Sequence, residues 1–256
     1  MVEALVIVLF GAAWGSFLNV VIYRLPQGQS LIRPPSHCPA CQTPIKPIHN
    51  IPVLAWLLLR GRCRTCGAKI PATYPLVEAL TPACFLLLYL NYGLSLHFFT
   101  SCLFTSGLIA LAFIDYYHQI LPDQITLPGL ALALLYAFFR GDLTLRQALV
   151  GALVGAGILL AVFGAYYLLR RKEGLGMGDV TLMLMVGAYL GWRPAVVTLI
   201  LGSFAGAIVG IIFIAARKQD MQTALPFGSF LAPAAFVAMV WGERLVTAYL
   251  GLFQLP

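Results

Sequence analysis

Apolar residues along this chain form eight long runs, separated by short polar or glycine-rich breaks. The runs cover approximately residues 2–23, 76–95, 97–115, 124–139, 146–169, 179–192, 195–216 and 226–252. A helix needs about 20 apolar residues to cross a bilayer core, and only 124–139 and 179–192 are much shorter. We therefore predict an all-α fold, a polytopic membrane helix bundle of about eight transmembrane helices.

One long polar segment, residues 25–75, interrupts this pattern. It is rich in Pro, Cys, Arg and Lys, and it cannot build much of a core without a cross-link such as a disulfide or a bound metal ion. Glu3 precedes the first run and Arg24 follows it, which reverses the flanks of a cleavable signal peptide. We therefore divide the chain into a retained first transmembrane helix at 1–24, a loop at 25–75 and a transmembrane bundle at 76–256.

Composition and charge add an orientation. The chain is 61% hydrophobic and 10% charged, with a mean hydropathy of +0.90, whereas soluble domains are roughly 25% charged. Cytoplasmic loops of membrane proteins carry an excess of Lys and Arg. With the N-terminus outside, twelve of the sixteen basic residues lie in cytoplasmic loops: Arg24, Arg33, Lys46, Arg60, Arg62, Arg64, Lys69, Arg170, Arg171, Lys172, Arg217 and Lys218. Both termini are then outside, and the charge indicates contact with lipid headgroups and no nucleic-acid partner.

The polar loop contains two C-x2-C pairs, Cys38 with Cys41 and Cys63 with Cys66, separated by 21 residues. Four thiolates in two such turns match a closed, structural zinc site. Disulfides and a redox pair are the alternatives, but structural disulfides are rare in the cytoplasm. A redox C-x2-C more naturally comes singly, at a helix start. We predict a small zinc-knuckle-like loop.

Two acids, Asp115 and Asp179, lie at the cytoplasmic ends of different apolar runs. Ionisable residues at membrane depth are costly and mark functional sites. Two apposed carboxylates that share one proton are the machinery of aspartic proteolysis. Helix capping is the alternative for Asp179, and it is the favoured interpretation for Asp123 in "LPDQIT", which we expect to be an N-cap. Gly176 and Gly178 can take backbone shapes closed to other residues, which would let a substrate backbone approach Asp179.

The chain resembles one known family in several ordered motifs: "GSFLNVVIYRLP" (15–26), "CPAC", "CRTCG", "YPLVEALTP" (74–82), "FIDYYHQILPD" (113–123) and "GLGMGDVTLM" (174–183). Their order is that of bacterial prepilin peptidases, also called type IV leader peptidases. The resemblance covers essentially the whole chain. The Gly-x-Gly-Asp element alone is weaker, since presenilin-like and preflagellin peptidases share it.

This resemblance implies an eight-helix aspartic endopeptidase of the bacterial inner membrane, with Asp115 and Asp179 as its catalytic pair. Its substrates would be type IV prepilins or type II secretion pseudopilins, whose basic leader is removed at the cytoplasmic face. The cysteine loop matches that of bifunctional members, which also methylate the new N-terminal amine with S-adenosylmethionine.

No glycine-rich dinucleotide fingerprint is present to hold S-adenosylmethionine. Its site must therefore be built from residues 25–75 and the adjoining helix ends. Glu78 and Asn19 are candidates because each is a polar side chain that flanks the loop, and interhelical hydrogen bonding is the alternative for both.

The residues alone leave two other classes open. A transporter or channel also uses intramembrane acids and glycine-broken helices, although it predicts internal repeats that we do not find in the sequence. A membrane-anchored zinc module that only binds partners would leave Asp115 and Asp179 dispensable.

Overall fold

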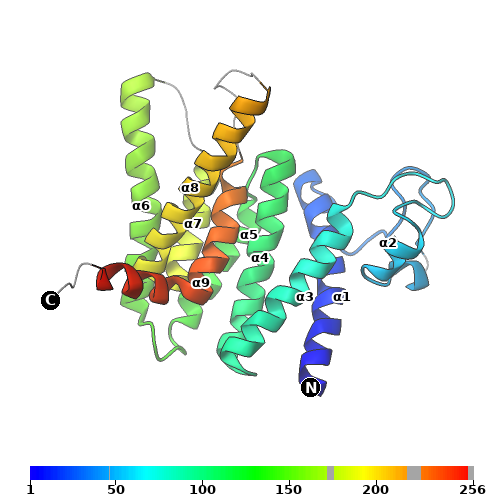
Figure 1. Cartoon of the computed structure of the whole chain (residues 1–256), viewed down its shortest axis with the longest axis horizontal. Coiled ribbons are helices and arrows are strands. Elements are labelled where there is room, and N and C mark those ends of the chain that lie inside the picture. Colours follow the sequence, from blue (N-terminus) through cyan, green and yellow to red (C-terminus); the bar gives the residue numbers. More distant parts are fainter. Residues whose placement is uncertain (46, 172–175, 218–225, 253–256) are drawn as a thin grey trace. The chain divides into compact units, whose positions relative to one another are not determined.

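Each of the eight apolar runs forms one helix in the computed structural model (Figure 1), which describes residues 1–45, 47–171, 176–217 and 226–252. The helices are α1 (Val2–Arg24), α3 (Thr73–Tyr92), α4 (Leu96–His118), α5 (Asp123–Tyr136), α6 (Leu145–Arg170), α7 (Met177–Leu190), α8 (Trp192–Arg217) and α9 (Gly228–Gly251). The described residues form no strand beyond two isolated bridges, so the all-α prediction is confirmed. Three of the basic residues that we place in cytoplasmic loops, Lys46, Lys172 and Lys218, lie outside the described residues, as do the neighbouring acids Glu173 and Asp220.

Within the described part of the chain, six helices are long and apolar enough to cross a membrane: α1, α3, α4, α6, α8 and α9. The other two, α5 and α7, have 14 residues each, which corresponds to about 21 Å of helix. Helix α5 is two residues shorter than the run 124–139 that predicted it, whereas α7 has the same length as the run 179–192 and begins two residues earlier. A crossing count of eight therefore stays a prediction.

Large apolar side chains are exposed around these helices, including Leu9, Leu90, Leu153, Phe204 and Ile211. A water-soluble protein rarely exposes so much contiguous apolar surface. The exposed faces are those that lipid would cover.

Two compact units divide the chain, Met1–Ala110 and Leu111–Pro256. In the first unit, α1 packs on α3 through its glycines. A Cβ built on Gly11 would lie 2.7 Å from Cα of Pro82, and one on Gly15 would lie 2.9 Å from Cα of Glu78. Small residues thus bring the two helix backbones into direct contact, as is common in membranes.

In the second unit, α7 is the central helix and contacts α5, α6, α8 and α9. Nine of its 14 residues are buried. It crosses α6 where Gly151 meets Gly187, and a Cβ on either glycine would collide with the carbonyl oxygen of the other. The crossing therefore admits only glycine on both helices.

The far end of α7 is fixed by Arg140, which follows α5. Its guanidinium donates two hydrogen bonds to Asp142, at 2.7 and 2.8 Å, and a third to the carbonyl of Tyr189, at 2.6 Å. It also lies 5.6 Å from the ring centroids of Tyr136 and Tyr189. This cation–π and hydrogen-bonded cluster ties the loop after α5 to the last turn of α7.

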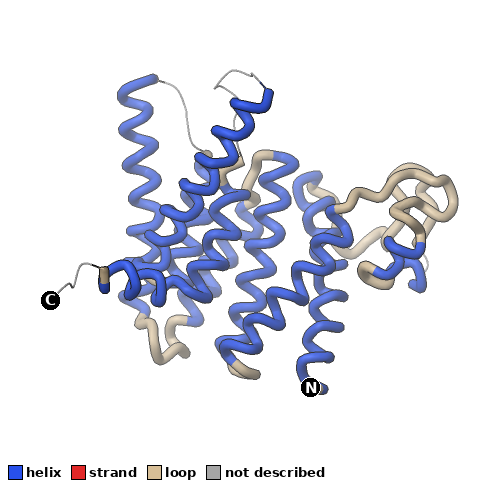
Figure 2. Tube along the Cα trace, viewed as in Figure 1, coloured by secondary structure: helices blue, strands red, loops and turns tan. Residues whose placement is uncertain are grey.

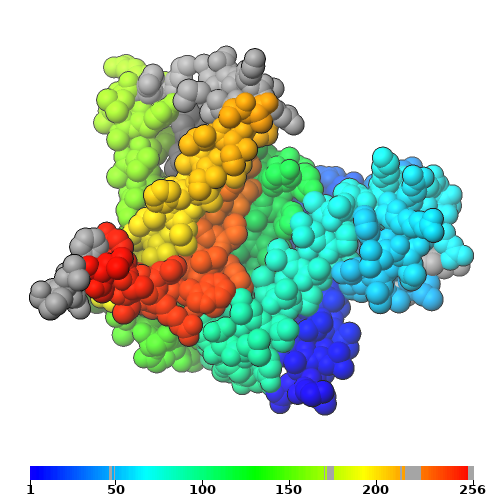
Figure 3. Space-filling model, viewed as in Figure 1, coloured from blue at the N-terminus to red at the C-terminus, as the bar shows by residue number. Residues whose placement is uncertain are grey.

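The polar segment 25–75 is mostly loop (Figure 2) and forms the blue-to-cyan lobe of the first unit in Figure 3. Its helices are short: η1 (Leu25–Gln27), η2 (Pro47–Asn50) and α2 (Leu54–Leu58). Among its described residues between Leu25 and Tyr74, only Cys38, Ala55 and Gly61 are buried. The segment thus has little core, as its composition predicts.

Candidate active site and metal centre

Asp115 lies in the last turn of α4 and is 5% exposed. The backbone N–H of Ser229, at the start of α9, donates to its Oδ2 at 2.7 Å. The hydroxyl of Ser229 lies 3.2 Å from the same oxygen and 2.9 Å from the carbonyl oxygen of Ala112, so its single proton can reach either acceptor. The first turn of α9 therefore holds the Asp115 carboxylate.

Asp179 is the third residue of α7 and is 7% exposed. Its carboxylate faces the backbone N–H of Gly176 and is close enough to Asp115 for the two negative charges to repel each other. The structure thus brings the two acids together within the second unit. The contact with Gly176 is the one that the capping alternative expects, so capping and pairing coexist at Asp179.

The side chain of Leu121 packs against Gly178 and Gly228, the glycines next to the two acids. A Cβ on Gly178 would lie 2.8 Å from Cβ of Leu121, and a Cβ on Gly228 would lie 2.8 Å from Leu121 Cδ1 and 3.1 Å from Asp115 Oδ2. Neither Gly176 nor Gly178 has a positive φ, so the expected special backbone shape is not what the structure shows. The missing Cβ of Gly178 instead makes room for Leu121.

Asp123 is exposed, unlike the buried acids Asp115 and Asp179. Helix α5 begins at Asp123 with Pro122 as its N-cap, so the helix start is confirmed and the capping position is wrong by one residue. Thr126 donates to the Asp123 carboxylate at 3.5 Å. Asp123 therefore belongs to a local helix start.

The two cysteine turns have the same backbone geometry. In the first turn, the N–H of Cys38 donates to the carbonyl of Thr43 at 3.0 Å, and the N–H of Gln42 donates to the carbonyl of Cys38 at 2.8 Å. In the second turn, the N–H of Cys63 donates to the carbonyl of Ala68 at 2.8 Å, and the N–H of Gly67 donates to the carbonyl of Cys63 at 2.9 Å. Equivalent residues also have positive φ, 57° at Gln42 and 71° at Gly67. The two turns are structural repeats that present their sulfurs alike.

The four sulfur atoms of Cys38, Cys41, Cys63 and Cys66 lie within 4.8 Å of one another, close enough to bind one metal ion. The backbone N–H groups of Cys66 and Thr65 lower the pKa of the Cys63 thiol to about 6, and hydrogen bonds with Thr43 lower the pKa of Cys41. Both effects favour the thiolate, the form that binds metals. Because neighbouring thiolates repel one another, four of them need a cation to stay together.

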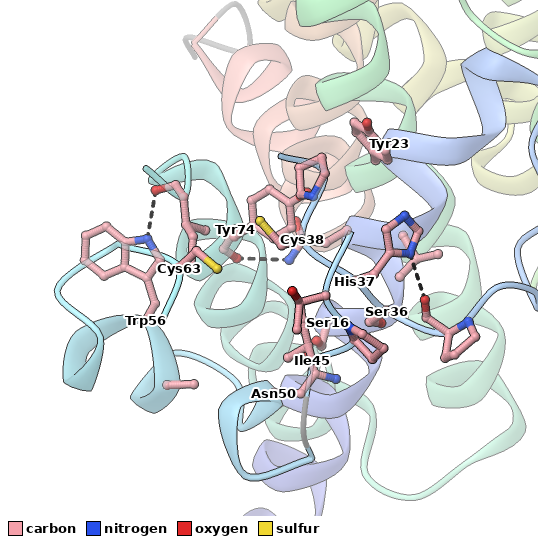
Figure 4. Close-up of a pocket in the computed structure, with 18 of the residues that line it drawn as sticks. Ser16, Tyr23, Ser36, His37, Cys38, Ile45, Asn50, Trp56, Cys63 and Tyr74 are labelled. Carbon is pink, nitrogen blue, oxygen red and sulfur yellow. Dashed lines mark hydrogen bonds between the residues drawn. The ribbon is translucent and has the colours of Figure 1, made fainter. Parts of the chain in front are cut away.

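A cavity of about 880 Å³ lies between this segment and the ends of α1 and α3 (Figure 4). Cys38 and Cys63 are on its wall, together with the aromatic rings of Tyr23, Trp56 and Tyr74. The indole N–H of Trp56 donates to Ile70 O at 3.1 Å, which fixes that ring. The volume lies within the range of about 300–1,000 Å³ that is typical of small-molecule sites.

The predicted candidates Asn19 and Glu78 both line this cavity. Asn19 Nδ2 donates to Tyr74 O at 3.1 Å, which is the interhelical bond that we gave as its alternative. Oε2 of Glu78 instead accepts the backbone N–H of Val53 at 2.7 Å, so Glu78 binds the loop.

Two protein-family models match this chain, one in its N-terminal part and one in its C-terminal part. Residues 9–92 match the bacterial peptidase A24 N-terminal domain, and residues 102–211 match the type IV leader peptidase family. The chain belongs to the type IV leader peptidase family. The first match contains the cysteine turns and the cavity, and the second contains Asp115 and Asp179. Ser229 lies beyond both matches, and its sequence context, the start of an apolar run, marks only a helix start.

Relatives of this family extend over nearly the whole chain. A protein of Aeromonas hydrophila is 39% identical over 96% of this chain and 93% of its own length. Proteins of Stutzerimonas stutzeri and Pseudomonas aeruginosa are 39% and 37% identical, over 96% and 95% of this chain and 93% and 92% of their own lengths. All three are named prepilin leader peptidase/N-methyltransferase. No solved structure matches the chain.

The packing of Leu121 predicts unequal effects of two alanine substitutions. Gly178→Ala forces Leu121 to move, and such overpacking costs about 1–3 kcal/mol. Gly157→Ala in α6 is the control, because a Cβ there meets nothing within 4 Å. We expect the thermal unfolding midpoint in detergent to fall by about 2–8 °C for Gly178→Ala and to stay within about 1 °C of native, or to rise, for Gly157→Ala. Equal midpoints for the two variants would contradict this packing.

Proposed function

We propose that the chain is a membrane aspartic endopeptidase that removes the leader of type IV prepilins or pseudopilins and then N-methylates the new N-terminus. The observation that carries the peptidase is the pair of buried carboxylates, Asp115 and Asp179, from separate helices of one unit. The names of the relatives support both activities. The substrates reside in a membrane, as the long apolar helices of this chain do.

Hydrolysis by this pair needs one charged and one protonated carboxyl group. The charged group takes a proton from a water molecule as the water oxygen bonds to the scissile carbonyl carbon, and the protonated group donates to the carbonyl oxygen. When the carbon–nitrogen bond breaks, the leaving amine takes the proton that the base removed from water, and the re-forming carbonyl returns its proton to the other carboxylate. Hydrogen bonds from Ser229 stabilise negative charge on Asp115, which suits Asp115 to act as the base and Asp179 as the acid.

The orientation follows from the basic residues. We assign the segment 25–75 and the acid-bearing ends of α4 and α7 to the cytoplasmic side of the inner membrane, with both termini outside. A prepilin leader is basic and cytoplasmic, whereas the body of the pilin helix is apolar. The scissile bond would then arrive at the membrane boundary, where Asp115 ends one apolar run and Asp179 begins another.

For the methyltransferase, we assign S-adenosylmethionine to the cavity of the first unit. The lining residues fit its chemistry: aromatic rings can stack on the adenine and contact the sulfonium, and the buried Arg24 can pair with the carboxylate. The cofactor would supply an activated methyl group. Asn19 would support the site indirectly, by holding α3 against α1 through Tyr74.

For the metal centre, we assign one structural zinc ion to Cys38, Cys41, Cys63 and Cys66. The matched turns and the clustered sulfurs support this, because a closed set of four thiolates is a typical structural zinc site. Since Cys38 and Cys63 also line the cavity, the ion would stabilise one of the cavity walls.

The first prediction from the proposed function tests the carboxylate pair. Asp115→Asn and Asp179→Asn each remove one member of the proton-sharing pair, so each should lower leader cleavage at least about 10³-fold, measured on a prepilin with purified enzyme in detergent. Asp123→Asn is the matched control, since Asp123 is exposed and outside the pair, and it should cleave within a few-fold of native. Normal processing by either Asp115→Asn or Asp179→Asn would overturn the assignment.

The second prediction concerns the metal. Purified protein should contain about one zinc ion per chain, and Cys63→Ser should reduce this severalfold, as measured by elemental analysis. Cys102→Ser is the control, because Cys102 is a buried cysteine outside the cluster. Native protein without metal, or equal zinc in the two variants, would exclude this site.

A further inference from the structure

The cavity of the first unit has two chemically different walls. One wall comes from the polar segment and contains the cysteine turns and Trp56, and the other comes from α1 and α3 and contains Ser16 and Tyr74 (Figure 4). Asn19 and Glu78 also line the cavity, from the same two helices. Glu78 is the only acidic residue among the described residues that line the cavity. It is 9% exposed, so its carboxylate is shielded from solvent.

The neighbours of Glu78 hold its side chain in place but do not use all the hydrogen-bond acceptor sites of its carboxylate. Oε2 accepts the N–H of Val53 at 2.7 Å, and Ser16 is a second partner. A carboxylate has about four lone-pair sites, so acceptor capacity is left for a ligand. Val53 has a φ of 61°, a strained conformation for a β-branched residue that persists only where surrounding contacts impose it.

Methyl transfer to an α-amine imposes a requirement that this carboxylate meets. An α-amino group has a pKa of about 7.7–8.0, so at neutral pH most of it is an ammonium ion with no lone pair for attack. A site that methylates it near neutral pH needs a group that binds the ammonium ion and receives its proton.

We infer that Glu78 holds the α-amine of the methyl acceptor and takes its proton during transfer. This role rests on the proposed methyltransferase function. The nitrogen lone pair bonds to the methyl carbon while the carbon–sulfur bond breaks and its electrons stay on sulfur. The proton given up by the ammonium ion passes to the Glu78 carboxylate and then to water.

The position of Glu78 favours the acceptor over the cofactor as its partner. The acceptor amine is the end of a pilin chain whose following residues form an apolar membrane helix, so it must enter from the bilayer side. Glu78 lies on α3, which is one of the candidate membrane spans. Arg64, Lys69 and His37 are on the opposite, loop-derived side of the cavity, where a water-soluble cofactor would enter.

The substitution Glu78→Gln removes the negative charge but keeps the size of the side chain, and its amide oxygen can still accept the hydrogen bond from the N–H of Val53. With full-length protein in detergent, we would measure binding of labelled S-adenosylmethionine by equilibrium dialysis, methylation of a mature-pilin peptide between pH 6.5 and 9.5, and leader cleavage. We expect cofactor binding within about threefold of native and cleavage unchanged, but methylation at least about 100-fold slower at pH 7. The defect should shrink as pH rises past about 8, where the amine loses its proton without help.

Two further variants complete the test. Glu78→Asp should restore part of the methylation at pH 7, and Glu3→Gln, an acid of the same unit outside the cavity, should behave as native. If Glu78→Gln abolishes cofactor binding, Glu78 serves the cofactor and the inference is wrong. A defect that is constant with pH, or no defect, also overturns it. Failure of native protein to bind S-adenosylmethionine would instead refute the proposed cofactor cavity.

Discussion

The close contact of α6 and α7 at Gly151 and Gly187 is the constraint on which the second unit depends. With no side chain between the two backbones, α7 can lie at the centre of the unit, surrounded by α5, α6, α8 and α9. Backbone groups at the ends of a short helix cannot face lipid, so a 14-residue helix is tolerated only with this protein covering. The same covering allows an acid near the start of the helix, because Asp179 is buried within the protein.

In the first unit, the corresponding constraint is the shortage of buried residues in segment 25–75. Hydrophobic burial cannot hold such a segment in one conformation. Two matched cysteine turns, the bond from Trp56 to Ile70 and the bond from Val53 to Glu78 fix it instead. Because Trp56, Ile70 and Glu78 line the cavity, the contacts that fix the conformation of the segment also fix the shape of the cavity.

The helices could be predicted from the sequence, and the residues of the proposed sites stand out in it, because lipid leaves few alternatives. Apolar runs in a bilayer must be helices, and an acid such as Asp115 or Asp179 stands out against them. The C-x2-C spacing likewise encodes a local turn geometry that needs no tertiary information. Access of a substrate backbone beside Gly178 stays a prediction, and the sequence did not reveal that the missing Cβ of this glycine accommodates Leu121.

What the sequence could not reveal are contacts between distant residues. Ser229 is 114 positions from Asp115 and lies in an unremarkable helix start, and Val53 has no feature that indicates a bond to Glu78. Gln42 occupies a position where its counterpart is Gly67, so the repetition of the two turns is visible in φ and hydrogen bonds and is hidden in residue type. Such contacts are set by how helices and turns pack, which periodicity and spacing do not encode.

The two sites that we propose lie in different compact units of the chain. Peptide-bond hydrolysis releases an α-amine, and that amine is what methyl transfer consumes, so the product of one site is the substrate of the other. The carboxylate pair belongs wholly to the second unit, and the cavity with Glu78 belongs wholly to the first. Each site is completed by contacts inside its own unit, Ser229 on Asp115 and Val53 on Glu78. Either reaction can therefore be lost by substitution while the other is retained, and the order of the two reactions is set by their chemistry: no α-amine exists to be methylated until the leader has been cleaved.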